Sequence, residues 1–166
     1  LLKTIKELEL NLKTIYIGGG TPTILTAEQL KRLLSLINDH VDVSTLEEFT
    51  LEGGRPDTIT EEKLSVAKDY GITRISVNPQ SLNEQVIKSI GRSHSIEDFY
   101  RAYDIAAKSG IKVINVDLIA GLPGDNFKYF SATFDKIIAL EPQNITVHTF
   151  CVTKAADILA QNQNVY

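Results

Sequence analysis

The 166-residue sequence contains no methionine, no tryptophan and a single cysteine, Cys151. One cysteine excludes an intramolecular disulfide and an all-cysteine metal site built from this chain. No apolar run approaches the length of about 20 residues that a membrane-spanning helix needs. The first residues also lack the charged-then-apolar pattern of a secretory leader. We therefore predict a cytoplasmic protein without a membrane partner.

Strong charge of one sign is also missing. Lys and Arg number 17 against 21 Asp and Glu, which leaves a net charge of -4. Nucleic-acid binding requires a basic surface, so no nucleic-acid partner is expected. Hydrophobic residues make up 43% and charged residues 23%, proportions typical of a soluble globular chain and too apolar for a disordered one. The length fits one domain, predicted to span residues 1–166.

Patterns typical of strands and helices alternate along the chain. A helical pattern over residues 1–10 precedes the first strand, and Thr26, Thr60 and Ser95 are predicted helix N-caps. A long amphipathic helix is expected from Phe127 to Ile138, and the tail after Ala155 has no strong pattern. Strands are predicted at residues 14–17, 48–52, 74–77, 113–119 and 145–150.

Near-continuous apolar strands separated by helices predict a parallel α/β sheet, either open and doubly wound or part of a (β/α) barrel. The opening helix has no strand before it, and the chain begins with Leu1 rather than methionine. Both observations favour a segment truncated at its N-terminus. We predict a partial (β/α) barrel with about five parallel strands, in which the first strand is missing.

Polar and glycine residues follow each predicted strand, at the ends where parallel α/β folds bind ligands. They comprise Gly18-Gly19-Gly20-Thr21-Pro22-Thr23, Glu52 with residues 53–57, Asn78-Pro79-Gln80-Ser81, Gly91-Arg92-Ser93-His94, Asp117 with residues 121–124, His148 and Cys151. Glycine amides can approach a carboxylate or an amine closely. These residues are therefore candidates for a ligand site.

Each candidate also has a purely structural interpretation. The glycines can form a sharp turn, Glu52 can be a solvated loop acid, and Arg92 an ordinary surface residue. His148 can be a satisfied core histidine, and Cys151 a small core residue. Asp117 lies in the most apolar strand, where an unpaired carboxylate is costly, so it needs a partner or a ligand hydroxyl. Taken one at a time, the residues leave these alternatives open.

Taken together and in order, the motifs resemble those of a known family. The resemblance covers about residues 13 to 152, and the family comprises the radical S-adenosylmethionine (SAM) enzymes related to oxygen-independent coproporphyrinogen III oxidase. The stretch at 54–59 is most similar to the coproporphyrinogen dehydrogenase branch of Gram-positive bacteria. The motifs are Tyr-Ile-Gly-Gly-Gly-Thr-Pro-Thr at 16–23, Glu-Phe-Thr-Leu-Glu at 48–52, Gly-Arg-Pro-Asp-Thr-Ile at 54–59, Arg-Ile-Ser-Val-Asn-Pro-Gln-Ser at 74–81, Ile-Gly-Arg-Ser-His at 90–94 and Asp-Leu-Ile-Ala-Gly-Leu-Pro-Gly at 117–124.

The resemblance implies a role in SAM binding at several positions. The loop with Gly19, Gly20 and Thr21 matches the one that holds the amino group of the methionine part of SAM. Cys151 falls near a position that contacts the adenosine end through backbone atoms. The further positions matched to SAM contacts are Glu52, Gln80, Arg92 and Asp117. No catalytic residue is assigned.

The resemblance also implies a [4Fe–4S] cluster held by a Cys-x-x-x-Cys-x-x-Cys loop after the first barrel strand. One cysteine cannot form that loop, because thiolates hold such clusters. We therefore expect the loop upstream of Leu1, no metal ligands in this chain, and a fragment that is inactive alone.

The intact enzyme is expected to convert coproporphyrinogen III to protoporphyrinogen IX by oxidative decarboxylation in haem biosynthesis. Its partner would be a small-molecule tetrapyrrole, and the reductant is not indicated. Alternatives are a haem-chaperone paralogue that uses SAM without decarboxylation and a non-catalytic barrel module. A phosphate-binding isomerase-type barrel is disfavoured, because its glycine loop would lie near the last barrel strands.

Overall fold

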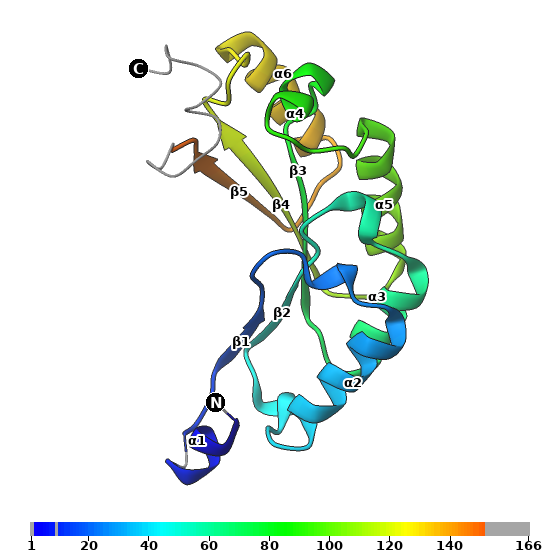
Figure 1. The fold of residues 1–166 in the computed structure, drawn as a ribbon, viewed down its shortest axis with the longest axis vertical. Coiled ribbons are helices and arrows are strands. Elements are labelled where there is room, and N and C mark those ends of the chain that lie inside the picture. Colours follow the sequence, from blue (N-terminus) through cyan, green and yellow to red (C-terminus); the bar gives the residue numbers. More distant parts are fainter. Residues whose placement is uncertain (1, 9, 152–166) are drawn as a thin grey trace.

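The computed structural model describes residues 2–8 and 10–151 (Figure 1). Its strands are parallel and follow one another in sequence order across one sheet. They are β1 (Thr14–Ile17), β2 (Glu48–Glu52), β3 (Arg74–Gln80), β4 (Val113–Ala120) and β5 (Asn144–Thr149). The prediction for the tail after Ala155 lies outside the described residues.

The helix α1 (Leu2–Glu7) precedes β1, and the strands of the described part are connected by helices on one side. The connecting helices are α2 (Ala27–Asn38), α3 (Glu61–Asp69), α4 (Glu84–Ser89), α5 (Ile96–Lys108) and α6 (Phe127–Ile138), with short 3₁₀ turns at Pro22–Ile24, Val43–Thr45 and Pro56–Thr58. Figure 1 shows α2 to α6 along the convex side of a curled sheet whose other face is open. A doubly wound sheet has helices on both faces and a reversal of strand order. One-sided helices and sequential order therefore confirm a partial (β/α) barrel.

The two sheet faces differ because side chains alternate along a strand. On the convex face, Phe49, Leu51, Ile75, Val77 and Val116 have no exposed surface and form the core with the helices. The concave face has polar side chains at the intervening positions, including a lining of Glu48, Thr50, Arg74, Ser76, Asn115 and Asp117. The fold thus separates an apolar layer that stabilises the chain from a polar face that is open to ligands.

The predicted caps are confirmed. Thr26 and Ser95 form reciprocal capping boxes with Gln29 and Asp98, and the Thr60 hydroxyl accepts a hydrogen bond from the Lys63 amide. Each cap satisfies amide groups that have no partner within the first helical turn. These local contacts fix where the helices begin, so the helix starts follow directly from the sequence.

Some element boundaries differ from the predictions. The expected helix over 1–10 ends at Glu7, and Leu8 is 62% exposed instead of packed. β3 continues to Gln80, three residues beyond the predicted end at Val77, through a register shift against β4. Pro79 obscured this extension, because proline cannot donate a ladder hydrogen bond and usually marks the end of a strand. In α6, Phe127 is 87% exposed and lies outside the apolar contact surface.

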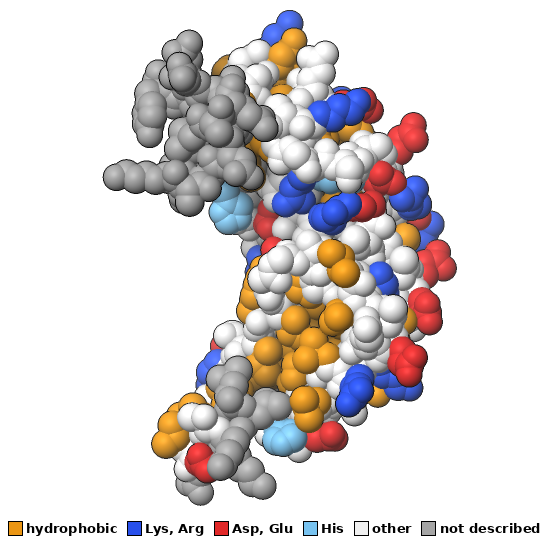
Figure 2. Space-filling model, in the orientation of Figure 1, with side chains coloured by type: hydrophobic (Ala, Val, Ile, Leu, Met, Phe, Trp, Pro, Cys, Tyr) orange, Lys and Arg blue, Asp and Glu red, His pale blue; other side chains and the backbone are white. Residues whose placement is uncertain are grey.

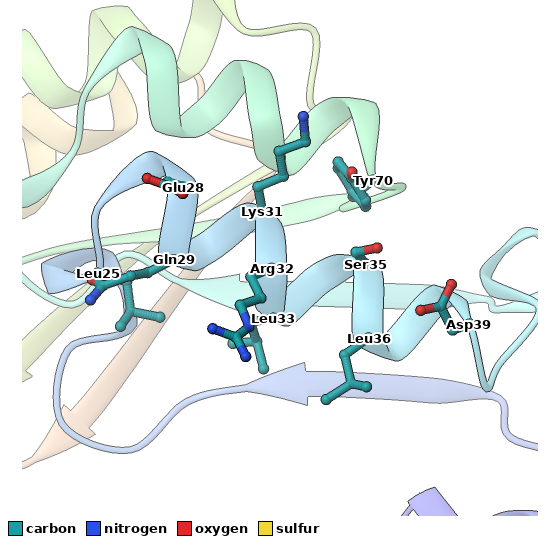
Figure 3. A pocket seen from close by; sticks show the side chains of 10 residues that line it. All are labelled: Leu25, Glu28, Gln29, Lys31, Arg32, Leu33, Ser35, Leu36, Asp39 and Tyr70. Carbon is teal, nitrogen blue, oxygen red and sulfur yellow. The ribbon is translucent and has the colours of Figure 1, made fainter.

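Surface chemistry follows the same layout. Figure 2 shows acidic and basic side chains spread over the helix-bearing side of the curved molecule and apolar side chains gathered on its lower part. A hollow of about 890 Å³ runs along α2, where Leu33 and Leu36 point toward β1 while Glu28 and Lys31 point away (Figure 3). Charged and aliphatic side chains both line this hollow. None of the site residues predicted from the sequence is among them.

Among the described residues, no helix combines the length and the apolar character required to cross a membrane.

Candidate functional site at the carboxyl ends of the strands

The glycine loop after β1 has open space around two of its three glycines. Gly19 and Gly20 have φ angles of +87° and +69°, and a Cβ at either position would meet no atom within 4 Å. Glycine is required here for its left-handed backbone, and the surrounding space is free. Gly18 is different, because its Cβ would lie 2.7 Å from Glu52 Oε2 and closer still to the Tyr16 ring. The loop therefore presents backbone amides beside a carboxylate.

Glu52 connects this loop to the end of β2. Its Oε2 accepts a hydrogen bond from the Gly19 amide at 3.2 Å. Its side chain is partly exposed at the rim of the sheet, so it is neither a core residue nor a freely solvated loop acid. A carboxylate at this place can hold an ammonium group next to the glycine amides.

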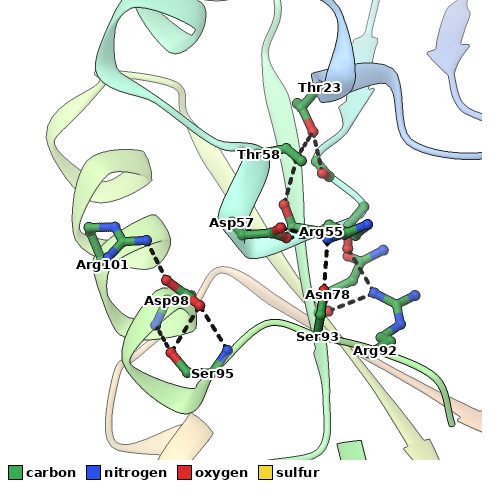
Figure 4. Close-up of polar contacts among 12 residues, drawn as sticks. Thr23, Arg55, Asp57, Thr58, Asn78, Arg92, Ser93, Ser95, Asp98 and Arg101 are labelled. Carbon is green, nitrogen blue, oxygen red and sulfur yellow. Dashed lines mark hydrogen bonds and ion pairs between the residues drawn. The ribbon is translucent and has the colours of Figure 1, made fainter. Parts of the chain in front are cut away.

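A buried threonine holds the first two loops together. Thr23 Oγ1 donates to the Gly53 carbonyl at 2.5 Å and pairs with Thr58 Oγ1 at 2.5 Å (Figure 4). The ammonium group of Lys63 donates to the carbonyls of Thr23 and Thr58 at 2.7 and 2.9 Å. These bonds fix the position of the glycine loop relative to Glu52.

The glycines at 53 and 54 permit the close approach of these loops. A Cβ on Gly53 would lie 2.2 Å from the backbone oxygen of Ser76, to which the Gly53 amide donates at 2.8 Å. Gly54 has a φ of +61°, and its Cβ would come within 3.0 Å of the Thr21 side chain. Larger residues would push the loop after β2 away from β3 and from the loop after β1.

Three buried polar groups on β3 have no protein partner. Ser76, Asn78 and Gln80 are 3%, 3% and 6% exposed, and the Oγ, Oδ1 and Oε1 atoms of these residues make no hydrogen bond among the described residues. They alternate along one strand, and Gln80 has a φ of 65°, a strained value for a residue other than glycine. Buried polar groups are nearly always satisfied, so such a row indicates a place for a polar ligand or for water.

Arg92 reaches the same rim from the loop after α4. Its Nη1 donates to the carbonyls of Gly54 and Asn78 at 3.3 and 3.5 Å, while Nε and Nη2 have no partner among the described residues (Figure 4). Burial, with a smaller effect from the Arg55 guanidinium, lowers the pKa of Arg92, and Glu52 and Asp117 partly oppose that change. Arg92 is therefore a half-buried cation with free donors, which contradicts its interpretation as an ordinary surface arginine.

Arg55 lies next to Arg92 and is already paired. Its Nε and Nη2 donate to the two Asp57 oxygens at 3.1 and 2.6 Å, and Nη2 also reaches Ser93 Oγ at 3.1 Å. This bidentate pair compensates much of the Arg55 charge. Arg55 keeps only Nη1 without a partner among the described residues, whereas Arg92 keeps both Nε and Nη2 and has no carboxylate bound to it.

Asp117 lies on the concave face of β4. The Asn115 side-chain amide donates to Asp117 Oδ1, while Oδ2 has no hydrogen-bond partner among the described residues. The side chain lines a cavity of about 250 Å³ together with Tyr16, His148 and other concave-face residues. The expected partner of this carboxylate thus exists, and one oxygen remains available to a ligand.

The Tyr16 hydroxyl lies close enough to Glu52 and Asp117 for both carboxylates to affect its pKa. Burial, followed by the carboxylates of Glu52 and Asp117, raises the pKa of the Tyr16 hydroxyl, and Arg74 opposes that change. Sequence reasoning missed Tyr16, Arg74 and Asn115, although alternation along β1, β3 and β4 would have placed them on the concave face.

The remaining candidates lie at the edge of this region. His148 lines the cavity with an exposed side chain, so its interpretation as a core histidine is wrong. Cys151 is also exposed, which contradicts its interpretation as a small core residue. Gly20 and Thr21 lie on the glycine loop after β1, and Gln80 lies at the end of β3.

Comparison with known proteins agrees with this arrangement. The sequence profile of the radical SAM superfamily matches residues 1–137. The chain belongs to the radical SAM superfamily. The cofactors of this superfamily are SAM and a [4Fe–4S] cluster.

Individual relatives extend the comparison of this radical SAM chain. The oxygen-independent coproporphyrinogen-III oxidase-like protein HemZ of Bacillus subtilis is 42% identical over 163 residues, which cover 98% of this chain and 32% of HemZ. The heme chaperone HemW of Lactococcus lactis is 37% identical over 138 residues, covering 83% of this chain and 36% of HemW. These relatives confirm the resemblance to the oxygen-independent coproporphyrinogen III oxidase family.

A solved structure supports the fold. The coproporphyrinogen III oxidase HemN of Escherichia coli, described as a radical SAM enzyme, superimposes with a TM-score of 0.75 at 27% identity. The matched part covers 84% of this chain and 32% of HemN. The chain thus spans about a third of the length of the relatives that it matches.

The two family cofactors fit these residues differently. The rim has a carboxylate beside glycine amides, an arginine with free donors and a row of unpartnered buried polar atoms, which suit the charged and hydroxyl groups of SAM. In the part of the chain that the structure describes, no group of three His, Cys, Asp or Glu side chains is placed to hold a metal ion. These residues therefore fit SAM and do not fit the cluster.

Proposed function

We propose that this chain is the SAM-binding part of a radical SAM enzyme that oxidatively decarboxylates coproporphyrinogen III. The observation that carries the proposal is the convergence of the Glu52 carboxylate, the free Arg92 donors and the unpartnered polar atoms of β3 at one rim of a partial barrel. SAM offers an ammonium, a carboxylate and ribose hydroxyls, which match these groups in charge and hydrogen bonding.

Each residue has a distinct task in this proposal. Glu52 and the glycine-loop amides hold the methionyl amino group, and the Arg92 fork binds the methionyl carboxylate. Asp117, through its free oxygen, accepts a ribose hydroxyl, and Gln80 supplies a further polar contact. Bound SAM supplies hydrogen-atom abstraction in this superfamily, while the residues named here bind it, orient it and exclude water.

The cluster would have to come from outside these 166 residues. Cys151 is the one cysteine of the chain, and clusters of this type are held by several thiolates. The fragment alone would therefore be inactive, and the tetrapyrrole would be contacted in part by other segments of the complete protein. HemZ and HemN, whose names refer to coproporphyrinogen III oxidase, support this choice of substrate.

A second function deserves the same test because heme chaperones also match. HemW proteins from four bacteria are between 31% and 37% identical over at least 80% of this chain. In this alternative the complete protein binds haem and uses SAM without forming vinyl groups. The SAM-binding rim would be shared by both functions.

The deciding experiment uses the complete protein that contains this chain, with its cluster reconstituted anaerobically. Coproporphyrinogen III, SAM and a chemical reductant such as dithionite are supplied, and tetrapyrrole products are separated by chromatography. Formation of the divinyl product with release of carbon dioxide supports the oxidase. Stable haem binding without any vinyl product supports the chaperone and overturns the proposed decarboxylation.

Site variants test the rim within the same experiment. Glu52→Gln and Asp117→Asn should each weaken SAM binding about tenfold or more, since each removes a charge-assisted hydrogen bond. Iron content should stay at the wild-type level, because in this assignment both residues contact SAM and neither supplies a ligand to the cluster. Unchanged SAM affinity in both variants would contradict the assigned roles, and iron loss would show that they act through folding.

A further inference from the structure

The concave face of the sheet contains a continuous polar network below the rim. Arg74 lies at its centre and contacts two neighbouring strands at once. Its Nη1 lies 3.1 Å from Glu48 Oε2 on β2, and its Nη2 donates to Asn115 Oδ1 on β4 at 3.1 Å. The Thr50 hydroxyl donates to the other Glu48 oxygen at 2.7 Å, so Glu48 is held in place as well.

Asn115 is the link between this network and Asp117. Its side chain is 3% exposed, and its Oδ1 accepts from Arg74 and, at 2.9 Å, from the Thr146 hydroxyl on β5. An arginine can only donate, so the amide oxygen must face Arg74 and the amide nitrogen must face the opposite way. That nitrogen donates to Asp117 Oδ1.

Removal of Arg74 would therefore reach Asp117 indirectly. Without the guanidinium, the Thr146 hydroxyl alone would hold Asn115 Oδ1, and the amide plane would be free to turn. The Asn115 amide nitrogen would then no longer fix Asp117 Oδ1 in one orientation, and the carboxylate would be free to rotate. Arg74 also places a positive charge on a face that carries Glu48, Glu52 and Asp117.

We propose that Arg74 is a positioning residue for the adenosyl ligand: through Asn115 it fixes one Asp117 oxygen and leaves the other directed at a ribose diol. This inference rests on the proposed function, because it assigns Asp117 to a SAM hydroxyl. Arg74 itself makes no ligand contact in this assignment. Its effect on binding depends entirely on the Asp117 carboxylate.

The test measures equilibrium binding of SAM and of a SAM analogue without ribose hydroxyls to the complete, anaerobically reconstituted protein. Arg74→Met should weaken SAM binding about tenfold and leave binding of the analogue nearly unchanged. Arg74→Lys should recover only part of the loss, because a single ammonium cannot bridge Glu48 and Asn115 as a planar fork does. In the Asp117→Asn background, Arg74→Met should have no further effect, since coupled residues are non-additive.

Controls separate positioning from folding. Arg101→Met removes an arginine whose side chain is 60% exposed on α5, and it should leave the binding of both ligands unchanged. Asn115→Leu breaks the link while leaving Arg74 with Glu48, and should reproduce the selective loss. This second variant keeps the proposal testable if Arg74→Met fails to fold.

The outcomes distinguish this proposal from the proposed function. If the wild-type protein does not bind SAM, the proposed function and this inference both fail. If it binds SAM but Arg74→Met and Asn115→Leu weaken SAM and the analogue equally, the proposed function stands and Arg74 is merely structural. Additive losses with Asp117→Asn would overturn the positioning role in the same way.

Discussion

His94 illustrates how burial at one residue creates a dependence on pH. Its side chain is 4% exposed, Nε2 lies 3.3 Å from the Pro79 carbonyl, and Nδ1 has no partner among the described residues. Burial lowers the pKa of His94, with Arg92 acting in the same direction, while the Pro79 carbonyl, Asp57 and Asp98 oppose it. The neutral ring is therefore the form that the folded chain accommodates.

This lowered pKa predicts loss of stability in mild acid. Below the ordinary value of 6.5, the unfolded chain binds a proton at His94 that the folded chain resists, so the free energy of unfolding falls as pH falls. Urea denaturation at pH 8 and pH 5.5 should show a smaller drop for His94→Gln than for the wild type. Equal drops in both proteins would contradict this assignment.

Glu52 and Gly18 show how residue identity is set by neighbours distant in sequence. Gly18 has no room for a Cβ because the Tyr16 ring and the Glu52 carboxylate occupy that space. The glycine triplet therefore combines two requirements: close approach at Gly18 and left-handed backbone at Gly19 and Gly20. Only the second requirement is a property of the loop by itself.

At the scale of elements, α5 connects the site loops to the sheet. Ser95 Oγ accepts from the Asp98 amide at 3.0 Å, and Asp98 Oδ2 accepts from the Ser95 amide at 2.8 Å. The helix begins at Ile96, two residues after His94, and follows directly on the segment that carries Arg92. Its N-terminal cap therefore helps to hold the Arg92 loop.

Loss of this cap should destabilise the protein measurably. Ser95→Ala removes the side-chain acceptor and should lower the free energy of unfolding by about 1 kcal/mol. Ser65→Ala on α3 is the matched control, because Ser65 is exposed within a helix, where alanine is at least as favourable. Chemical denaturation measures both changes. A cost for Ser65→Ala equal to that for Ser95→Ala would show that the cap has no special role.

β3 is the element in which local expectation and structure differ most. Its extension past Pro79 brings Gln80 to the rim with a φ of 65° and shifts the register against β4. Proline in the sequence indicates the end of a strand, and a positive φ is unusual within one. The strand continues because its neighbours and the packed helices hold it, and such long-range contacts are not visible in local sequence.

For the whole molecule, one face of the sheet forms the hydrophobic core and the other face carries the candidate binding residues. The convex face packs apolar side chains against helices, while the concave face keeps polar groups, three of which on β3 lack partners among the described residues. Polar groups buried without partners cost stability. A face of this kind is compatible with a stable fold because the opposite face supplies the core.

Neighbouring residues on β3 test this division. Ile75 has no exposed surface in the core, so Ile75→Ala should lower the free energy of unfolding by about 2–5 kcal/mol. Ser76→Ala removes a buried hydroxyl without a partner and should leave stability unchanged or raise it. Urea denaturation of both variants provides the comparison. A large loss for Ser76→Ala would mean that its hydroxyl is satisfied and would weaken the case for a ligand beside it.

The sequence was sufficient for features that depend on near neighbours. Strand and helix locations, the capping boxes of Thr26 and Ser95, and the candidate residues at strand ends follow from periodicity, turn chemistry and the direction of parallel strands. The family resemblance, confirmed by the comparisons, rested on the same ordered motifs. The SAM-binding roles of the candidates stay predictions.

Tertiary structure was needed wherever two distant segments meet. It placed Gly19 against Glu52, locked Thr23 to Gly53 and linked Arg74 to Asp117 through Asn115. It also showed that His148 and Cys151 are exposed. The physical reason is that periodicity reports which face a side chain occupies, whereas its hydrogen-bond partner depends on strand register, sheet curvature and loop packing, which arise only when the whole chain folds.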